Sequence, residues 1–133
     1  MIVADFSNAQ VVMLLASNDV VQIGHLQRDL LASKIRYFLA VLLDRANLTD
    51  ATAGHITAVG GRSPVVLVID YRFAGPDCDV LLRTAKSVRR AATIACVVVN
   101  PPEESARRQS LMAGGVRLFD GGDADASEHL TLQ

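Results

Sequence analysis

The chain of 133 residues is 50% hydrophobic and 20% charged, so it is long and apolar enough to form one domain around its own core. Thirteen basic and fourteen acidic side chains leave a formal charge of −1, which excludes a strongly basic nucleic-acid-binding surface. No apolar run approaches the roughly 18 residues needed to span a bilayer. The first residues lack the basic start of a signal peptide, and Cys78 and Cys96 form neither a disulfide framework nor a zinc motif. We therefore expect a cytoplasmic protein that contacts neither membrane nor nucleic acid directly.

Five short apolar runs predict β-strands that are buried on both faces, which is typical of a parallel sheet covered by helices. The predicted strands are 11–16, 37–43, 65–69, 94–99 and 116–119. Between them, the spacing of apolar residues predicts helices, which are 20–32, 50–59, 77–91 and 103–113.

Two of these helices carry specific expectations. In 20–32, the apolar side chains at helical spacing are expected to face the sheet, and they are Ile23, Leu26, Leu30 and Leu31. In 103–113, Glu103 and Glu104 are expected in the first turn, where their charges would suit the helix dipole.

Strands and helices alternate along the whole chain, which predicts right-handed crossovers and a doubly wound α/β sandwich, a (βα)5 fold with a five-stranded parallel sheet. Residues 10–122 are expected to form the domain, residues 1–9 an N-terminal tail, and residues 123–133 a short last helix or a frayed tail. Ligands of such sheets bind beyond the carboxyl ends of the strands, so functional residues are expected there.

Polar residues follow four of the predicted strands. Asp19 comes shortly after the first strand, Asp70 follows the third, Asn100 the fourth, and Asp120 the fifth. If Asp19 and Asp70 meet at the carboxyl edge, their carboxylates would repel each other and attract a hard cation such as Mg²⁺. The alternative is that these residues only cap helices and strand ends, where Asp and Asn are common.

The segment 65–82, VVLVIDYRFAGPDCDVLL, resembles the phosphoacceptor segment of two-component receiver domains. In that family an apolar strand ends in Asp, followed by two variable residues, Met-Pro-Gly, one more residue and Asp-Gly. The spacing agrees here, while Phe73, Ala74 and Cys78 replace Met, Pro and Gly. The segment 113–119, AGGVRLF, also resembles the turn and fifth strand of the family, and the resemblance covers about residues 10 to 122.

The resemblance implies a flavodoxin-like sheet of order 2-1-3-4-5, with Asp70 as the phosphoacceptor. It also implies a Mg²⁺ ion held by an acidic pair after the first strand, by Asp70 and by the backbone carbonyl of Arg72. The acidic pair falls either on Ser17-Asn18 or on Asn18-Asp19. We prefer the second register, because it puts the apolar residues of 20–32 on the inward face of the helix.

Several positions of the implied site are changed in this chain, and they are Asn18, Asn100, Gly121 and Leu118. Asn18 replaces one acid of the pair, so Mg²⁺ binding is expected to be weak. Asn100 stands where the family has Thr or Ser, Gly121 where it has Lys, and Leu118 where it has an aromatic residue. The chain therefore resembles a degenerate receiver domain.

We expect a signalling domain of a phosphorelay, impaired in phosphorylation at Asp70, that is not an enzyme and acts by protein–protein contact. The expected partners are a sensor histidine kinase or another signalling protein, and a second copy of the chain. A conventional receiver with Mg²⁺-dependent phosphorylation of Asp70 is the alternative. A hydrolase of the haloacid dehalogenase kind is more distant, because Tyr71-Arg72 follows Asp70 where those enzymes have Asp-x-Asp.

Overall fold

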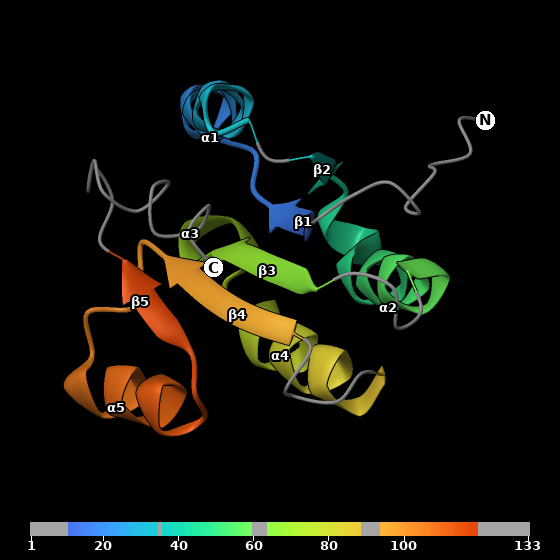
Figure 1. The fold of residues 1–133 in the computed structure, drawn as a ribbon. Coiled ribbons are helices and arrows are strands. Elements are labelled where there is room, and N and C mark those ends of the chain that lie inside the picture. The colour runs from blue at the N-terminus through green and yellow to red at the C-terminus, as the bar shows by residue number, and fades with distance from the viewer. Residues whose placement is uncertain (1–10, 35, 60–63, 89–93, 120–133) are drawn as a thin grey trace.

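A computed structural model describes residues 11–34, 36–59, 64–88 and 94–119. The strands are β1 (Val11–Ala16), β2 (Tyr37–Leu42), β3 (Val65–Asp70), β4 (Ile94–Val99) and β5 (Arg117–Phe119). The helices are α1 (Val20–Ala32), the 3₁₀ turn η2 (Arg45–Asn47), α2 (Leu48–Val59), α3 (Tyr71–Ala74), α4 (Asp77–Val88) and α5 (Ser105–Ala113). Strand and helix alternate along the described chain, as the sequence predicts (Figure 1).

All strand pairs are parallel, and the strand order is β2-β1-β3-β4-β5. This is the order of the flavodoxin-like α/β fold, which confirms the predicted fold class. β1 and β3 are the best buried strands, with every residue buried, because each has a strand on both sides and helices on both faces. β3 is central, and its pairing with β4 extends to its last residue, Asp70 opposite Val99.

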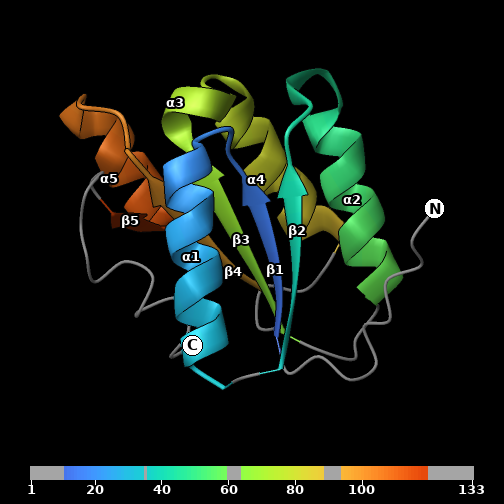
Figure 2. The same ribbon diagram turned by 90° about the horizontal axis from the view of Figure 1, so that it is seen from above.

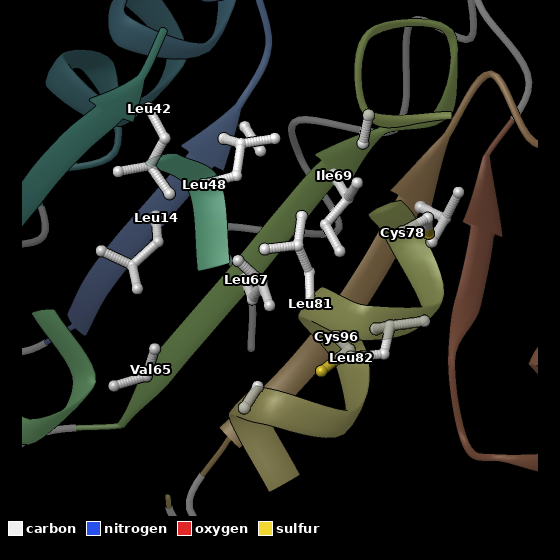
Figure 3. Close-up of a cluster of buried hydrophobic side chains, with 14 of the residues drawn as sticks. Leu14, Leu42, Leu48, Val65, Leu67, Ile69, Cys78, Leu81, Leu82 and Cys96 are labelled. Atoms are coloured by element: carbon white, nitrogen blue, oxygen red, sulfur yellow. The ribbon is translucent and has the colours of Figure 1, made fainter. Parts of the chain in front are cut away.

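Alternate residues of the strands build two separate cores, one on each face of the sheet. On one face α2, α4 and α5 pack against the sheet, and Figure 3 shows part of this core, including Leu67, Ile69 and Leu81. On the other face Leu26 and Leu30 of α1 pack against Met13 and Leu15. Figure 2 shows α1 and α4 on opposite sides of the strands. The carboxyl edge of the sheet is held from both faces, which fixes the positions of the residues that follow β1, β3 and β4.

Two local expectations are wrong. Leu31 is 71% exposed, because successive helical residues are about 100° apart and Ile23, Leu26 and Leu30 already form the inward stripe of α1. α5 begins at Ser105 and has no acidic residue in its first turn. Glu103 and Glu104 precede the helix, since the chain is still extended at Glu104 after the two prolines.

The start of α2 also differs from the expectation. Asp44 caps η2 through a hydrogen bond from Ala46 N to its Oδ1, and α2 then continues from Leu48 instead of beginning at Asp50. The predicted tails, 1–9 and 123–133, and the end of the helix predicted at 77–91 lie outside the described residues.

Candidate functional site

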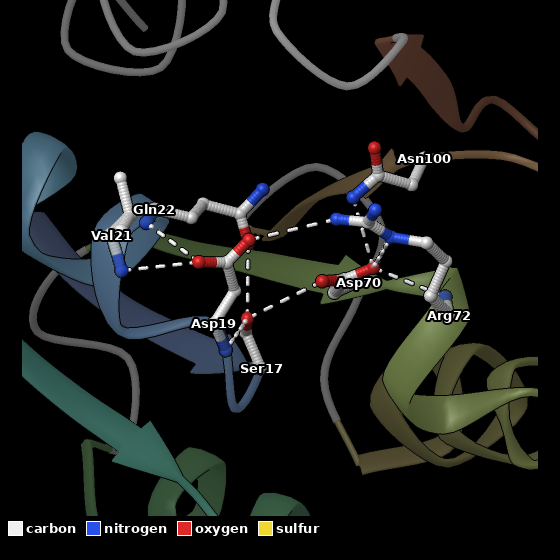
Figure 4. A network of polar contacts seen from close by, with 7 residues as sticks. All are labelled: Ser17, Asp19, Val21, Gln22, Asp70, Arg72 and Asn100. Carbon is white, nitrogen blue, oxygen red and sulfur yellow. Dashed lines mark hydrogen bonds and ion pairs between the residues drawn. The ribbon is translucent and has the colours of Figure 1, made fainter.

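Asp70 ends β3 at the carboxyl edge of the sheet, and it is only 2% exposed. Its Oδ1 accepts hydrogen bonds from Arg72 N at 3.0 Å and from Asn100 Nδ2 at 3.1 Å. The bond from Arg72 N also makes Asp70 the N-cap of α3. Because an isolated buried charge is strongly disfavoured, these donors are what allow a carboxylate at this position (Figure 4).

Ser17 directly follows β1 and is fully buried beside Asp70. Its Oγ lies 3.4 Å from Asp70 Oδ2 and 3.0 Å from Gln22 Oε1, and it accepts a hydrogen bond from Asp19 N at 3.1 Å. A hydroxyl has one proton, so Ser17 donates to either Gln22 or Asp70 at a given moment. Ser17 thus connects the loop after β1 to the carboxylate that ends β3.

Asp19 is the N-cap of α1, and its Oδ1 accepts hydrogen bonds from Val21 N at 3.0 Å and Gln22 N at 3.2 Å. Its other oxygen, Oδ2, lies 3.6 Å from Arg72 Nη2. Arg72 Nε in turn lies 3.7 Å from Asp70 Oδ1. The Arg72 guanidinium therefore stands between the two carboxylates, and Figure 4 shows its side chain reaching from α3 toward Asp19.

Asn100 is held in the left-handed region of backbone space, with φ of 49°. Its backbone N donates to Phe119 O at 2.9 Å, which ties the loop after β4 to the end of β5. Arg108 of α5 also donates from Nε to Pro102 O in this loop, at 2.7 Å. Asn is one of the few residues that tolerate this conformation, and the fixed loop aims its side-chain amide at Asp70.

The remaining positions of the implied site are less connected to Asp70. Asn18 is exposed between Ser17 and Asp19. Leu118 pairs with Val98 and packs against the core formed with α4 and α5, whereas Phe119 packs against the core of the opposite face. Gly121 lies outside the described residues.

The donor set does not fit a Mg²⁺ ion while Arg72 is in place. The four carboxylate oxygens of Asp19 and Asp70 all have partners within the protein, and two of them face the guanidinium. Among the described residues, no group of three or more His, Cys, Asp or Glu side chains converges on one point. A divalent cation would have to displace Arg72.

Sequence reasoning missed the side chains of Arg72 and Gln22. The family pattern expects the cation of this edge to be a lysine after β5, where this chain has Gly121, and it treats Tyr71 and Arg72 as variable residues. The short helix α3 redirects this segment and turns the Arg72 side chain back over the sheet edge. The available signal was a basic residue two positions after the buried Asp70, within reach of a carboxylate after β1.

Cys78 lies on α4 and Cys96 on β4, and both are buried in the core between this helix and the sheet (Figure 3). Burial, with a smaller effect of the Asp79 charge, raises the pKa of the Cys78 thiol from 9.0 to about 12. Burial also raises the pKa of Cys96. Both thiols therefore stay protonated at neutral pH and act as small apolar side chains.

Comparison of the chain with family models, with curated proteins and with solved structures finds no match. None of the helices in the described part of the chain is long and apolar enough to cross a membrane.

Proposed function

We propose that the chain is a signalling domain of the receiver type, with Asp70 as a poorly reactive phosphoacceptor, that acts by contact with other proteins. The observation that carries the proposal is the place of Asp70: a nearly buried carboxylate at the carboxyl end of the central strand in a 2-1-3-4-5 sheet. Side chains from three other segments contact it, namely Ser17, Arg72 and Asn100.

The same contacts support low reactivity. Phosphoryl transfer to a carboxylate requires one of its oxygens to attack phosphorus while positive charge stabilises the transferred group. Asp70 Oδ1 already accepts two hydrogen bonds, and Oδ2 lies next to the buried Ser17 hydroxyl. A phosphoryl donor therefore meets an occupied carboxylate, and each broken contact raises the barrier.

Protein contact is the output that the proposal assigns to the domain, with a sensor histidine kinase or another signalling protein as the partner. The edge around Asp70 offers exposed groups for such contact. Val20 and Val21, in the first turn of α1 next to Asp19, are 80% and 67% exposed. Arg72 is also largely exposed, so an apolar and a charged group lie together at the rim of the site.

The proposal is tested with acetyl phosphate and Mg²⁺, using intact-protein mass spectrometry on wild type, Asp70→Asn and Asp79→Asn. In the reaction an Asp70 oxygen bonds to phosphorus, the bond from phosphorus to acetate breaks, and acetate leaves. We expect slow, partial addition of one phosphoryl group in wild type and in Asp79→Asn, an exposed control on α4. Asp70→Asn should gain none.

Two results would contradict the proposal. Equal labelling of Asp70→Asn would show that Asp70 is not the acceptor. Rapid and complete Mg²⁺-dependent labelling of wild type would mean that the chain is a conventional receiver and that the contacts around Asp70 do not limit its reactivity.

A further inference from the structure

The side chain of Arg72 lies between two carboxylates at the carboxyl ends of two paired strands. Arg72 Nη2 lies 3.6 Å from Asp19 Oδ2, and Arg72 Nε lies 3.7 Å from Asp70 Oδ1. Asp19 follows β1, and Asp70 ends β3, the strand that pairs with it. Without a cation between them, these two negative charges at one sheet edge would repel each other.

We propose that the Arg72 guanidinium is the resident cation of this edge. It takes the place that a divalent metal ion would fill between Asp19 and Asp70, and it keeps Mg²⁺ and Mn²⁺ from binding there. The proposal concerns cation binding alone, so it does not depend on whether Asp70 accepts a phosphoryl group.

The local structure keeps the guanidinium at this place. Arg72 N is bonded to Asp70 Oδ1, so the backbone of the arginine is tied to one of the two carboxylates that its side chain contacts. The side chain is therefore present at a high effective concentration, which a free metal ion must overcome. Other arginines of the described chain pair elsewhere: Arg45 with Asp77, and Arg107 with Asp79.

Charge makes the guanidinium and a metal ion mutually exclusive. Two carboxylates and one guanidinium leave a single uncompensated negative charge among these groups, whereas removal of Arg72 leaves two. A divalent cation in contact with both carboxylates would also stand close to the positive guanidinium and be repelled by it. The Arg72 side chain is 64% exposed, so it can leave the site, and solvent screens part of this repulsion.

The test uses Mn²⁺ as the probe, because a bound Mn²⁺ ion broadens amide NMR signals near it. The variants are Arg72→Gln, which removes the charge, Arg72→Lys, which keeps it, and Arg107→Gln, which removes an arginine that pairs with Asp79. We expect Arg72→Gln to bind Mn²⁺ about ten-fold or more tightly than wild type, with broadening centred on residues 17–19 and 70–72. Wild type, Arg72→Lys and Arg107→Gln should all bind weakly.

Further variants show which carboxylate the additional Mn²⁺ affinity of Arg72→Gln depends on, and they provide a replacement if that variant does not fold. Asp19→Asn added to Arg72→Gln should abolish the increase in Mn²⁺ affinity, because it removes one of the two carboxylates. Arg72→Ala serves in place of Arg72→Gln if circular dichroism shows that the glutamine variant is not folded. Equal affinity of wild type and Arg72→Gln, or tight binding by Arg72→Lys, would overturn the proposal.

Discussion

Asn100 makes two separable contributions to the folded state, and substitution can distinguish them. Its side-chain amide donates to the buried Asp70 carboxylate at 3.1 Å, and its backbone has a φ of 49°. Asn100→Gly removes the hydrogen bond but tolerates this φ, so it should lower the free energy of unfolding by about 2 kcal/mol, the usual range for a bond to a charged group. Asn100→Ala also removes the hydrogen bond, but it keeps a Cβ in the left-handed region without the polar side chain that helps Asn tolerate it, and should lower the free energy of unfolding by about 1 kcal/mol more than Asn100→Gly does.

Urea unfolding followed by circular dichroism at neutral pH measures both effects. The expected order of stability is wild type, then Asn100→Gly, then Asn100→Ala. In an Asp70→Ala background the cost of Asn100→Gly should fall below about 1 kcal/mol, because the acceptor is gone. Equal stability of the two Asn100 variants would refute the backbone argument. A change within about 0.5 kcal/mol for both would refute the hydrogen bond.

Three other predictions concern the edge, the core and assembly. Ser17→Ala should lower the free energy of unfolding by about 1–3 kcal/mol in urea titrations, because Asp19 N and Asp70 Oδ2 lose a buried partner; no loss would mean that these bonds are weak. The raised pKa of Cys78 means that the folded state keeps a proton which the unfolded chain releases above its usual 9.0. The free energy of unfolding should therefore not depend on this thiol below about pH 9, and above that pH it should fall by up to about 1.4 kcal/mol per pH unit. The fall should be shallower in Cys78→Ala. An identical slope in both proteins would contradict the raised pKa of Cys78. Met112 on α5 is an apolar side chain that is 54% exposed. Analytical ultracentrifugation at increasing protein concentration should show self-association, and Met112→Glu should weaken it. A monomer at every concentration would count against the expected homodimer.

The fold could be predicted because its strands are short apolar runs buried on both faces. Val65 to Ile69 is short, has no polar residue and consists mostly of β-branched residues, which favours an interior strand, and the alternation with amphipathic segments then predicts the fold class. The rotation of each helix about its own axis is harder to predict from the sequence. Leu30 and Leu31 are equally apolar, and only packing against β1 and its neighbours determines that Leu30 is buried and Leu31 exposed.

The polar residues at the ends of the predicted strands indicate the edge of the sheet where polar side chains meet, because the carboxyl ends of parallel strands lie at one edge. Asp70 ends β3, Asn100 follows the neighbouring strand β4, and the two side chains are joined by a hydrogen bond. The contacts of Arg72 and Gln22 could not be read from this rule. They depend on where a long side chain turns after a helix begins, and on which of several acceptors lies within its reach. The sequence places Ser17 only in the alternative register of the acidic pair, whereas the structure buries its hydroxyl 3.4 Å from Asp70 Oδ2.

The initial rate of Asp70 phosphorylation by acetyl phosphate with Mg²⁺, compared between wild type and Arg72→Gln, decides whether Arg72 stands in the place of the metal ion. If the edge is a receiver-type site in which Arg72 stands in place of the metal, wild type should react slowly and Arg72→Gln about ten-fold or more faster. The faster reaction should require Mg²⁺ and disappear in the Asp70→Asn background. Equal rates in the two proteins, or fast labelling of wild type, would contradict the account.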